Sequence, residues 1–143
     1  MNDQVSLNRD GISVLFNDAQ RDVSGLLESF VVSLEATGLS ASVRVDYPSY
    51  GPSLVRFFSD LADHWRGWEG EITWHSLEGE LDLAAVSDVL GYITITVRVH
   101  PPTYPVSWTA GASVLVEAGQ LERLHRQFVS FCGYEAVAHK PGA

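Results

Sequence analysis

Hydrophobic and polar residues alternate along most of the chain, which is the pattern of strands that bury one face. The alternating segments are residues 5–16, 30–45, 71–85, 93–100 and 112–116. Asp10-Gly11 and Thr37-Gly38 interrupt the alternation, and such pairs favour tight turns between antiparallel strands. The pattern therefore predicts two N-terminal hairpins, followed by further strands in meander order.

In two segments the apolar spacing changes to three and four residues, which is typical of one face of a helix. The two stripes are Leu54, Phe57, Leu61 and Trp65, and then Leu121, Leu124, Phe128 and Phe131. Ser53 is a suitable N-cap for the first helix, and Gly67 and Gly133 are suitable ends for the two helices. We expect both stripes, including Trp65, to face the core, and Trp74 to be buried with them.

Together these elements predict an α+β domain. We expect a two-layer sandwich in which a mostly antiparallel sheet of about seven or eight strands, in meander order, carries two amphipathic helices on one face. Residues 1–138 form a single domain in this prediction, and residues 139–143 a frayed tail. Whether the first hairpin joins the main sheet stays open.

The most regular alternation also predicts a register. A two-residue turn at Glu78-Gly79 pairs Trp74 with Leu83, keeps apolar residues on one face, and sets His75 opposite Asp82. A five-residue connection over 87–91 then pairs the next strand. The pairs that it predicts are Ala85 with Ile93, Leu83 with Ile95, Asp82 with Thr96, and Glu80 with Arg98.

Composition narrows the classes of function. The chain has 143 residues, 45% of them hydrophobic, and nine basic against eighteen acidic residues give a net charge of −9. Nucleic-acid binding depends on basic patches, so we expect no nucleic-acid partner. A single cysteine excludes an internal disulfide and a thiolate-rich zinc site. Without an export signal or a long apolar run, the expected location is the cytoplasm, with no membrane partner.

The negative charge is concentrated in residues 60–88, where eight carboxylates face Arg66 alone, a net charge of −7. Such a stretch predicts a negative patch that steers a basic protein partner, with Trp68 as an anchor. The candidate partner-binding residues are Asp63, Trp68, Glu69, Glu71, Glu78, Glu80 and Asp82. The alternative interpretation is a solvated acidic face that only maintains solubility.

The sequence offers few groups for catalysis. His75 beside Asp82 has the composition of a general base held by a carboxylate, and His64 is a second acid/base candidate. The same pair is equally a solvated cross-strand contact. No histidine spacing typical of a metal site occurs, and Asp60 with His64 is only an (i, i+4) pair, so we expect neither metal nor cofactor.

Two adjoining segments carry a resemblance to a known family. The segments WRGWEGE over 65–71 and WHSLEGEL over 74–81 resemble the hallmark of an uncharacterised family of small actinobacterial proteins, known only as a domain of unknown function. The resemblance covers about two-thirds of the chain and implies no activity. Tyr92 departs from it, because histidine is the more usual residue there. A structural interpretation of the motif is that Arg66 forms ion pairs with Glu69 and Glu71 and fixes the turn from helix to strand, which makes the motif a structural corner.

Two functions of different classes remain. The first is a non-catalytic acidic binding module that masks a basic partner, in the manner of immunity or antitoxin proteins. The alternative is a small-molecule-binding protein or small enzyme that uses a pocket between sheet and helices with a His/Asp pair. A homodimer formed through an exposed sheet edge or the Pro101–Pro105 loop is compatible with either.

Overall fold

The computed structural model describes residues 3–133, which form an α+β fold of two antiparallel four-stranded sheets and two helices. The first sheet contains β1 (Val5–Arg9), β2 (Ile12–Arg21), β3 (Leu27–Ala36) and β4 (Leu39–Asp46). The second contains β5 (Ile72–His75), β6 (Leu81–Ser87), β7 (Tyr92–Val99) and β8 (Ala110–Glu117). The helices are α1 (Leu54–Asp63) and α2 (Leu121–Cys132), the latter preceded by a 3₁₀ turn over Ala118–Gln120. The expected tail at 139–143 lies outside the described residues.

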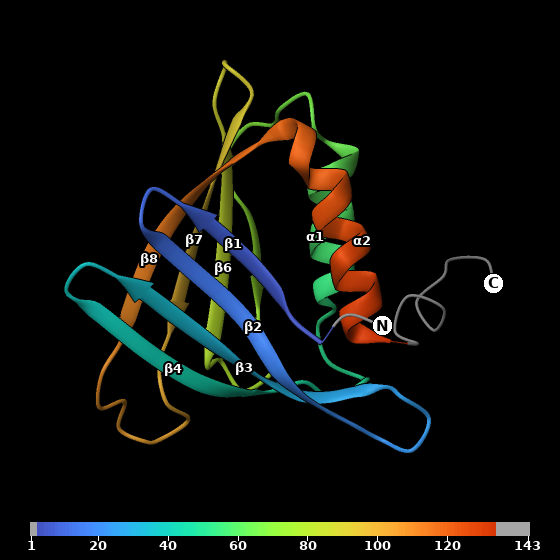
Figure 1. The fold of residues 1–143 in the computed structure, drawn as a ribbon, viewed down its shortest axis with the longest axis vertical. Helices are drawn as coiled ribbons and strands as arrows, with labels where there is room; N and C mark the ends of the chain where they lie inside the picture. The colour runs from blue at the N-terminus through green and yellow to red at the C-terminus, as the bar shows by residue number, and fades with distance from the viewer. Residues whose placement is uncertain (1–2, 134–143) are drawn as a thin grey trace.

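The strands form two sheets, where the sequence pattern predicted one. Within each sheet the strands pair in chain order, but no pairing joins β4 to β5, which are separated in the chain by α1. The two N-terminal hairpins therefore form a sheet of their own. In Figure 1 this sheet crosses in front of β6, β7 and β8, while α1 and α2 stand side by side at its edge. The helices pack on each other, and they also reach the edge strands, α1 at β5 and α2 at β1.

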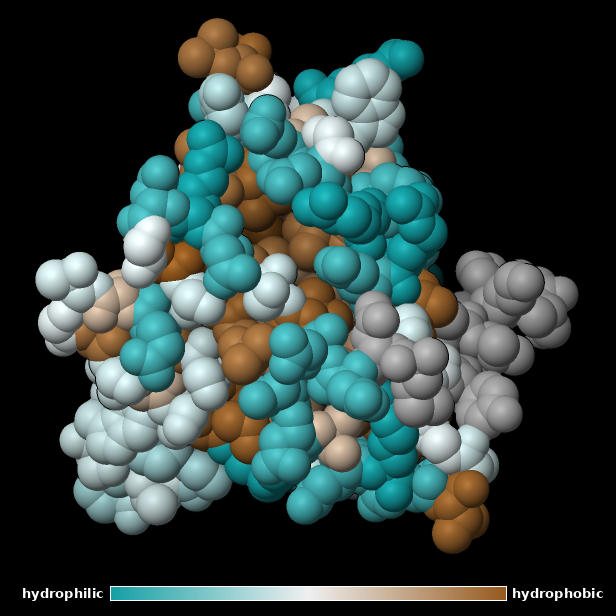
Figure 2. All heavy atoms as spheres, in the orientation of Figure 1, coloured by the Kyte–Doolittle hydropathy of each residue, from teal (hydrophilic) through white to brown (hydrophobic). Residues whose placement is uncertain are grey.

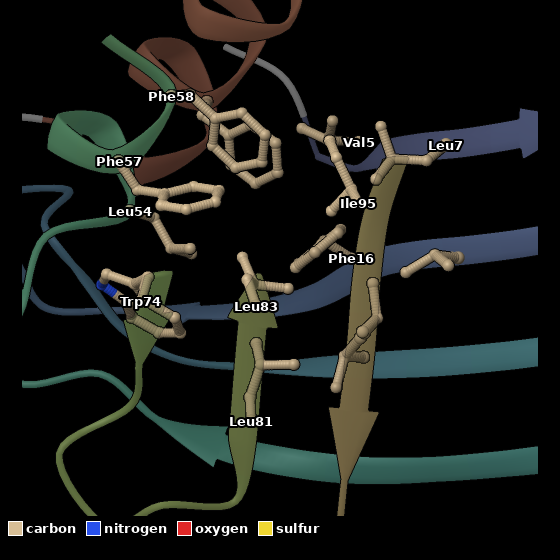
Figure 3. Packing of buried hydrophobic residues seen from close by; sticks show 14 of the residues in the cluster. Val5, Leu7, Phe16, Leu54, Phe57, Phe58, Trp74, Leu81, Leu83 and Ile95 are labelled. Carbon is tan, nitrogen blue, oxygen red and sulfur yellow. The ribbon is translucent and has the colours of Figure 1, made fainter. Parts of the chain in front are cut away.

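The inward faces of both sheets and the apolar stripes of both helices share one core. Figure 3 shows Leu54, Phe57 and Phe58 of α1 pointing toward residues of both sheets. The Phe58 ring stacks on Phe128 of α2, with ring centroids 4.1 Å apart. Phe128 in turn meets the edge of Phe16 from β2, at 5.0 Å. Aromatic contacts thus join the two helices to the first sheet.

The helix ends follow the predicted caps, with one exception. The Ser53 hydroxyl accepts the Arg56 N–H at the start of α1, and Gly133, with φ 75°, ends α2. Helix α1, however, stops at Asp63, before the predicted stripe reaches Trp65. The prediction that Trp65 lies in the core is therefore wrong, since its side chain is 53% exposed. Trp74 is buried as predicted. None of the described helices has the length and apolar character needed to span a membrane.

The predicted register is confirmed for one strand pair and wrong for the next. Trp74 pairs with Leu83 and His75 with Asp82, as the turn at Glu78-Gly79 predicted. On the other side of β6 the prediction is off by two residues, because Ser87 still belongs to β6 and pairs with Ile93. Asp82 consequently lies opposite Arg98, and Thr96 opposite Ala84.

The β2–β3 loop is held by the carboxylate of Asp22. Its Oδ1 accepts hydrogen bonds from the Ser24 hydroxyl at 2.6 Å, from the Ser24 N–H at 2.8 Å and from the Leu26 N–H at 3.0 Å. The Ser24 hydroxyl is the main cause that lowers the pKa of Asp22 below its ordinary value of 3.8, followed by the Leu26 N–H. A depressed carboxyl pKa stabilises the fold at pH values above the unfolded-state pKa.

We expect an NMR pH titration of the Asp22 carboxyl carbon to have its midpoint below the ordinary aspartate value. The stabilisation from this carboxylate should disappear as the pH falls through that midpoint, because the protonated group accepts fewer hydrogen bonds. Ser24→Ala should move the midpoint upward. Ser42→Ala, at an exposed serine of β4, should leave it unchanged, and equal midpoints in all three proteins would contradict the assignment.

Candidate functional site

The structure divides the predicted acidic patch between the two ends of β6. Glu69 and Glu71 precede β5, beside the end of β6, because Ile72 pairs with Ala85. Glu78 belongs to the turn that leads into the start of β6, and Asp82 is the second residue of that strand. The seven candidate residues therefore do not form one continuous surface.

Glu80 is not a surface residue at all. Its side chain is 2% exposed and accepts the Ser76 hydroxyl at 2.6 Å on one oxygen and the Asp46 N–H at 2.9 Å on the other. Asp46 ends β4 of the first sheet, whereas Ser76 and Glu80 flank the β5–β6 turn of the second. The expectation that Glu80 contacts a partner is therefore wrong, since this carboxylate is used to join the two sheets.

The segment that connects α1 to β5 is fixed against β6. Trp68 is half-buried, and its indole Nε1–H donates to the Ala85 carbonyl oxygen at 3.2 Å. Gly67 has φ 118°, a conformation that strains other residues, and a Cβ there would also lie within a tight 3.1 Å of the Ser87 hydroxyl oxygen. Trp68 is thus an anchor of the loop, rather than the exposed contact that the sequence analysis considered.

Arg66 has a different contact from the one expected. Its guanidinium lies over the exposed Trp65 ring, 5.1 Å from the centroid. Across residues 3–133, no ion pair joins it to a carboxylate, so the predicted bridge to Glu69 and Glu71 is absent from the described structure. The motif still forms a corner, held by Gly67 and Trp68.

A surface hollow of about 310 Å³ opens between this corner and the β6–β7 turn, and Glu69, Asp88 and Val89 are among its lining residues. At the tip of the turn, Val89 and Leu90 are 99% and 79% exposed. Brown spheres at the top of Figure 2 show this apolar tip projecting from the molecule.

Hydrogen bonds of Asp88 hold the backbone on both sides of the apolar tip. Asp88 Oδ1 accepts the N–H of Leu90 at 2.8 Å and the N–H of Tyr92 at 3.0 Å. The Asp88 N–H in turn donates to the Tyr92 carbonyl oxygen at 3.0 Å. We call this region the acidic end, defined by Glu69, Asp88 and Val89, which line the hollow together with Arg66, and by Leu90 of the tip. The sequence analysis treated 87–91 only as a connection; two apolar residues between Asp88 and Gly91 were the missed signal.

The two candidate acid/base residues, His64 and His75, are exposed and lie on different elements of the fold. His75 and Asp82 are cross-strand neighbours on the outward face of the second sheet, not between sheet and helices. His75 Nδ1 lies 3.2 Å from the Ser76 carbonyl oxygen, and His64 Nδ1 lies 2.8 Å from that of Asp60. In the described part of the chain, neither histidine forms an ion pair, and no group of three His, Cys, Asp or Glu residues is arranged to hold a metal.

Comparison with known proteins identifies the family. The fold defines the class as an α+β domain of two antiparallel sheets. The chain belongs to DUF6228, a family of unknown function, which it matches over residues 5–135. No curated protein matches the chain, and no solved structure matches it. The matched range contains every described strand, both helices and the acidic end.

Proposed function

We propose that this protein is a non-catalytic binding module that masks a basic protein partner, as immunity and antitoxin proteins do. The observation that carries the proposal is the acidic end, where a hydrogen-bonded turn presents two exposed apolar side chains beside carboxylates. Exposed apolar residues held in a fixed conformation support binding, because burying them is favourable and little conformational freedom is lost. The carboxylates support a basic partner, because complementary charge accelerates and orients association.

The separation of the acidic residues suggests two roles. Glu69 and Asp88 belong to the proposed contact surface, together with the tip. Glu78 and Asp82, at the start of β6, contribute through the overall field of a chain with net charge −9. Contact residues should therefore affect dissociation, whereas the more distant carboxylates should affect association and its dependence on salt.

The partner can be found by placing a photo-crosslinking amino acid at Leu90 in cells of the source organism. The same amino acid at Thr94, on the outward face of β7, is the control. We expect a crosslink to a basic protein from position 90 and none from position 94. Equal crosslinking at both positions, or an acidic product at position 90, would contradict the proposed surface.

With that partner purified, matched variants test the contribution of each group. Val89→Ser with Leu90→Ser should weaken binding about tenfold or more, since two apolar side chains lose their burial. Glu69→Lys should weaken binding and lower its salt dependence. Glu28→Lys, an equal charge reversal at an exposed residue of β3, should change affinity less than about twofold. If calorimetry finds the two reversals equivalent, only net charge matters and the acidic end is not the interface.

A further inference from the structure

A second surface hollow differs from the one at the acidic end, because its polar lining contains no carboxylate. It occupies about 250 Å³ where edge strand β1 of the first sheet meets edge strand β8 of the second, under α2. The two strands are neighbours but are not hydrogen-bonded to each other. In Figure 2, brown side chains show at the bottom of an opening beside α2. We call this feature the seam hollow.

Its apolar lining comes from three different elements. Leu7 of β1, Val116 of β8 and Leu124 of α2 line it, and each is about 4% exposed. These side chains belong to the main hydrophobic core, so the wall is held in place by packing on its other side. A short apolar group placed in the hollow would therefore meet a preformed surface.

Its polar lining is rich in hydrogen-bond donors. Arg123 presents a guanidinium group, which has donors only. Gln120 accepts the Glu117 N–H at 2.9 Å through Oε1, which leaves the NH₂ group of its side chain as the donor. Ser6 accepts from the Asn8 side chain at 3.2 Å, which leaves the hydroxyl hydrogen of Ser6 to donate. Three side chains thus offer donors to the same space.

Among residues 3–133, the charge of Arg123 is not compensated by an ion pair. Arg9 lies 3.9 Å from a Glu117 oxygen, and Arg126 lies 3.7 Å from a Glu122 oxygen. Arg123 lies in the first turn of α2. It has no carboxylate of the described residues within ion-pair distance. In a chain with net charge −9, a hollow with one unpaired guanidinium and no acidic lining residue is complementary to an anion.

We propose that the seam hollow binds a small organic carboxylate, with the carboxylate on Arg123 and a short apolar chain against Leu7, Val116 and Leu124. Guanidinium groups match carboxylates with two parallel hydrogen bonds, and one arginine balances one negative charge. The volume equals that of about eight water molecules, which suits a small acid rather than a nucleotide. The seam hollow shares no lining residue with the hollow at the acidic end, so this site goes beyond the proposed masking function.

The test is a titration of the ¹⁵N-labelled protein with hexanoate, followed by amide chemical shifts. Hexanol and hexylamine are probes of similar length without the negative charge, and inorganic phosphate is an anion without the apolar chain. We expect hexanoate to give saturable shifts at residues 6–8, 114–116 and 120–124, and the other three probes to bind at least about tenfold more weakly.

Two variants of the same helix separate a site from a general charge effect. Arg123→Gln should weaken hexanoate binding about tenfold, because the charge-assisted hydrogen bonds are lost. Arg126→Gln removes the same charge three residues away and should leave the affinity within about twofold. Both residues are exposed, so the amide spectrum of each variant should remain that of the folded protein.

Three results would overturn the proposal. The first is the absence of saturable shifts with hexanoate in the wild-type protein. The second is an equal effect of the two arginine variants. The third is binding of phosphate or hexanol as tight as that of hexanoate, which would remove the carboxylate or the apolar chain from the assignment.

Discussion

Replacing Phe128 by alanine is expected to lower the free energy of unfolding by about 3–5 kcal/mol. Phe128 is fully buried, stacks on Phe58 at 4.1 Å between ring centroids and meets Phe16 at 5.0 Å. Its removal would leave a cavity between both helices and the first sheet, and Phe58 of α1 and Phe16 of β2 are held by different elements that cannot both move to close the space. Urea unfolding followed by tryptophan fluorescence measures the loss.

The adjacent residue provides the control for that experiment. Val129 is only partly buried at the margin of the core, so Val129→Ala should cost about 1 kcal/mol or less. Both substitutions raise the helix propensity of α2, so their difference reports packing and not helix formation. Similar losses in the two variants would show that the aromatic cluster is not the centre of the core.

The second large effect is expected at Glu80. Glu80→Ala should lower the free energy of unfolding by about 2–3 kcal/mol, because the buried Ser76 hydroxyl and the Asp46 N–H both lose their acceptor. Glu80→Gln keeps one carbonyl acceptor and the side-chain volume, so it should cost about half as much. Thermal or urea unfolding of the two variants measures the difference.

The neighbouring Glu78 is exposed in the same turn and serves as the matched residue. Glu78→Ala removes an equal charge and should change stability by less than about 0.5 kcal/mol. If Glu80→Ala were as mild as Glu78→Ala, the connection between the two sheets would not depend on this carboxylate. Hydrogen exchange of the Asp46 amide is the local readout, and it should accelerate only in the Glu80 variants.

Much of the fold could be predicted from alternation because the strands bury only one face. Apolar matching also selected the correct β5–β6 register, since a slip of one residue would have turned Trp74 or Leu83 toward solvent. The β6–β7 error was a slip of two, which keeps every side chain on its own face. Alternation cannot detect such a slip; only the turn at Asp88 decides it, through hydrogen bonds to Leu90 and Tyr92.

The candidate site was less predictable because its residues depend on distant partners. By alternation Glu80 belongs beside Asp82 on the polar face, but Asp46, 34 residues earlier, offers an N–H that turns it inward. Trp65 continues the apolar spacing of α1 in the sequence, but α1 ends at Asp63, so this spacing does not place Trp65 in the core. The number of sheets depends on whether β4 pairs with β5. The alternation of apolar residues is the same in both cases, so it could not predict two sheets.

Within each sheet the strands pair only with their neighbours in the chain, and this order has a consequence for folding. Most hairpin connections are short, although residues 100–109 form a longer one between β7 and β8, so little entropy is lost in forming most of the strand pairs. Larger closure entropies accompany the contacts of α2 with α1 and of β1 with β8, and the β1–β8 contact spans most of the chain. We therefore expect each sheet to form before the two dock, and the docking step to bring Phe128 of α2 against Phe58 of α1 and Phe16 of β2.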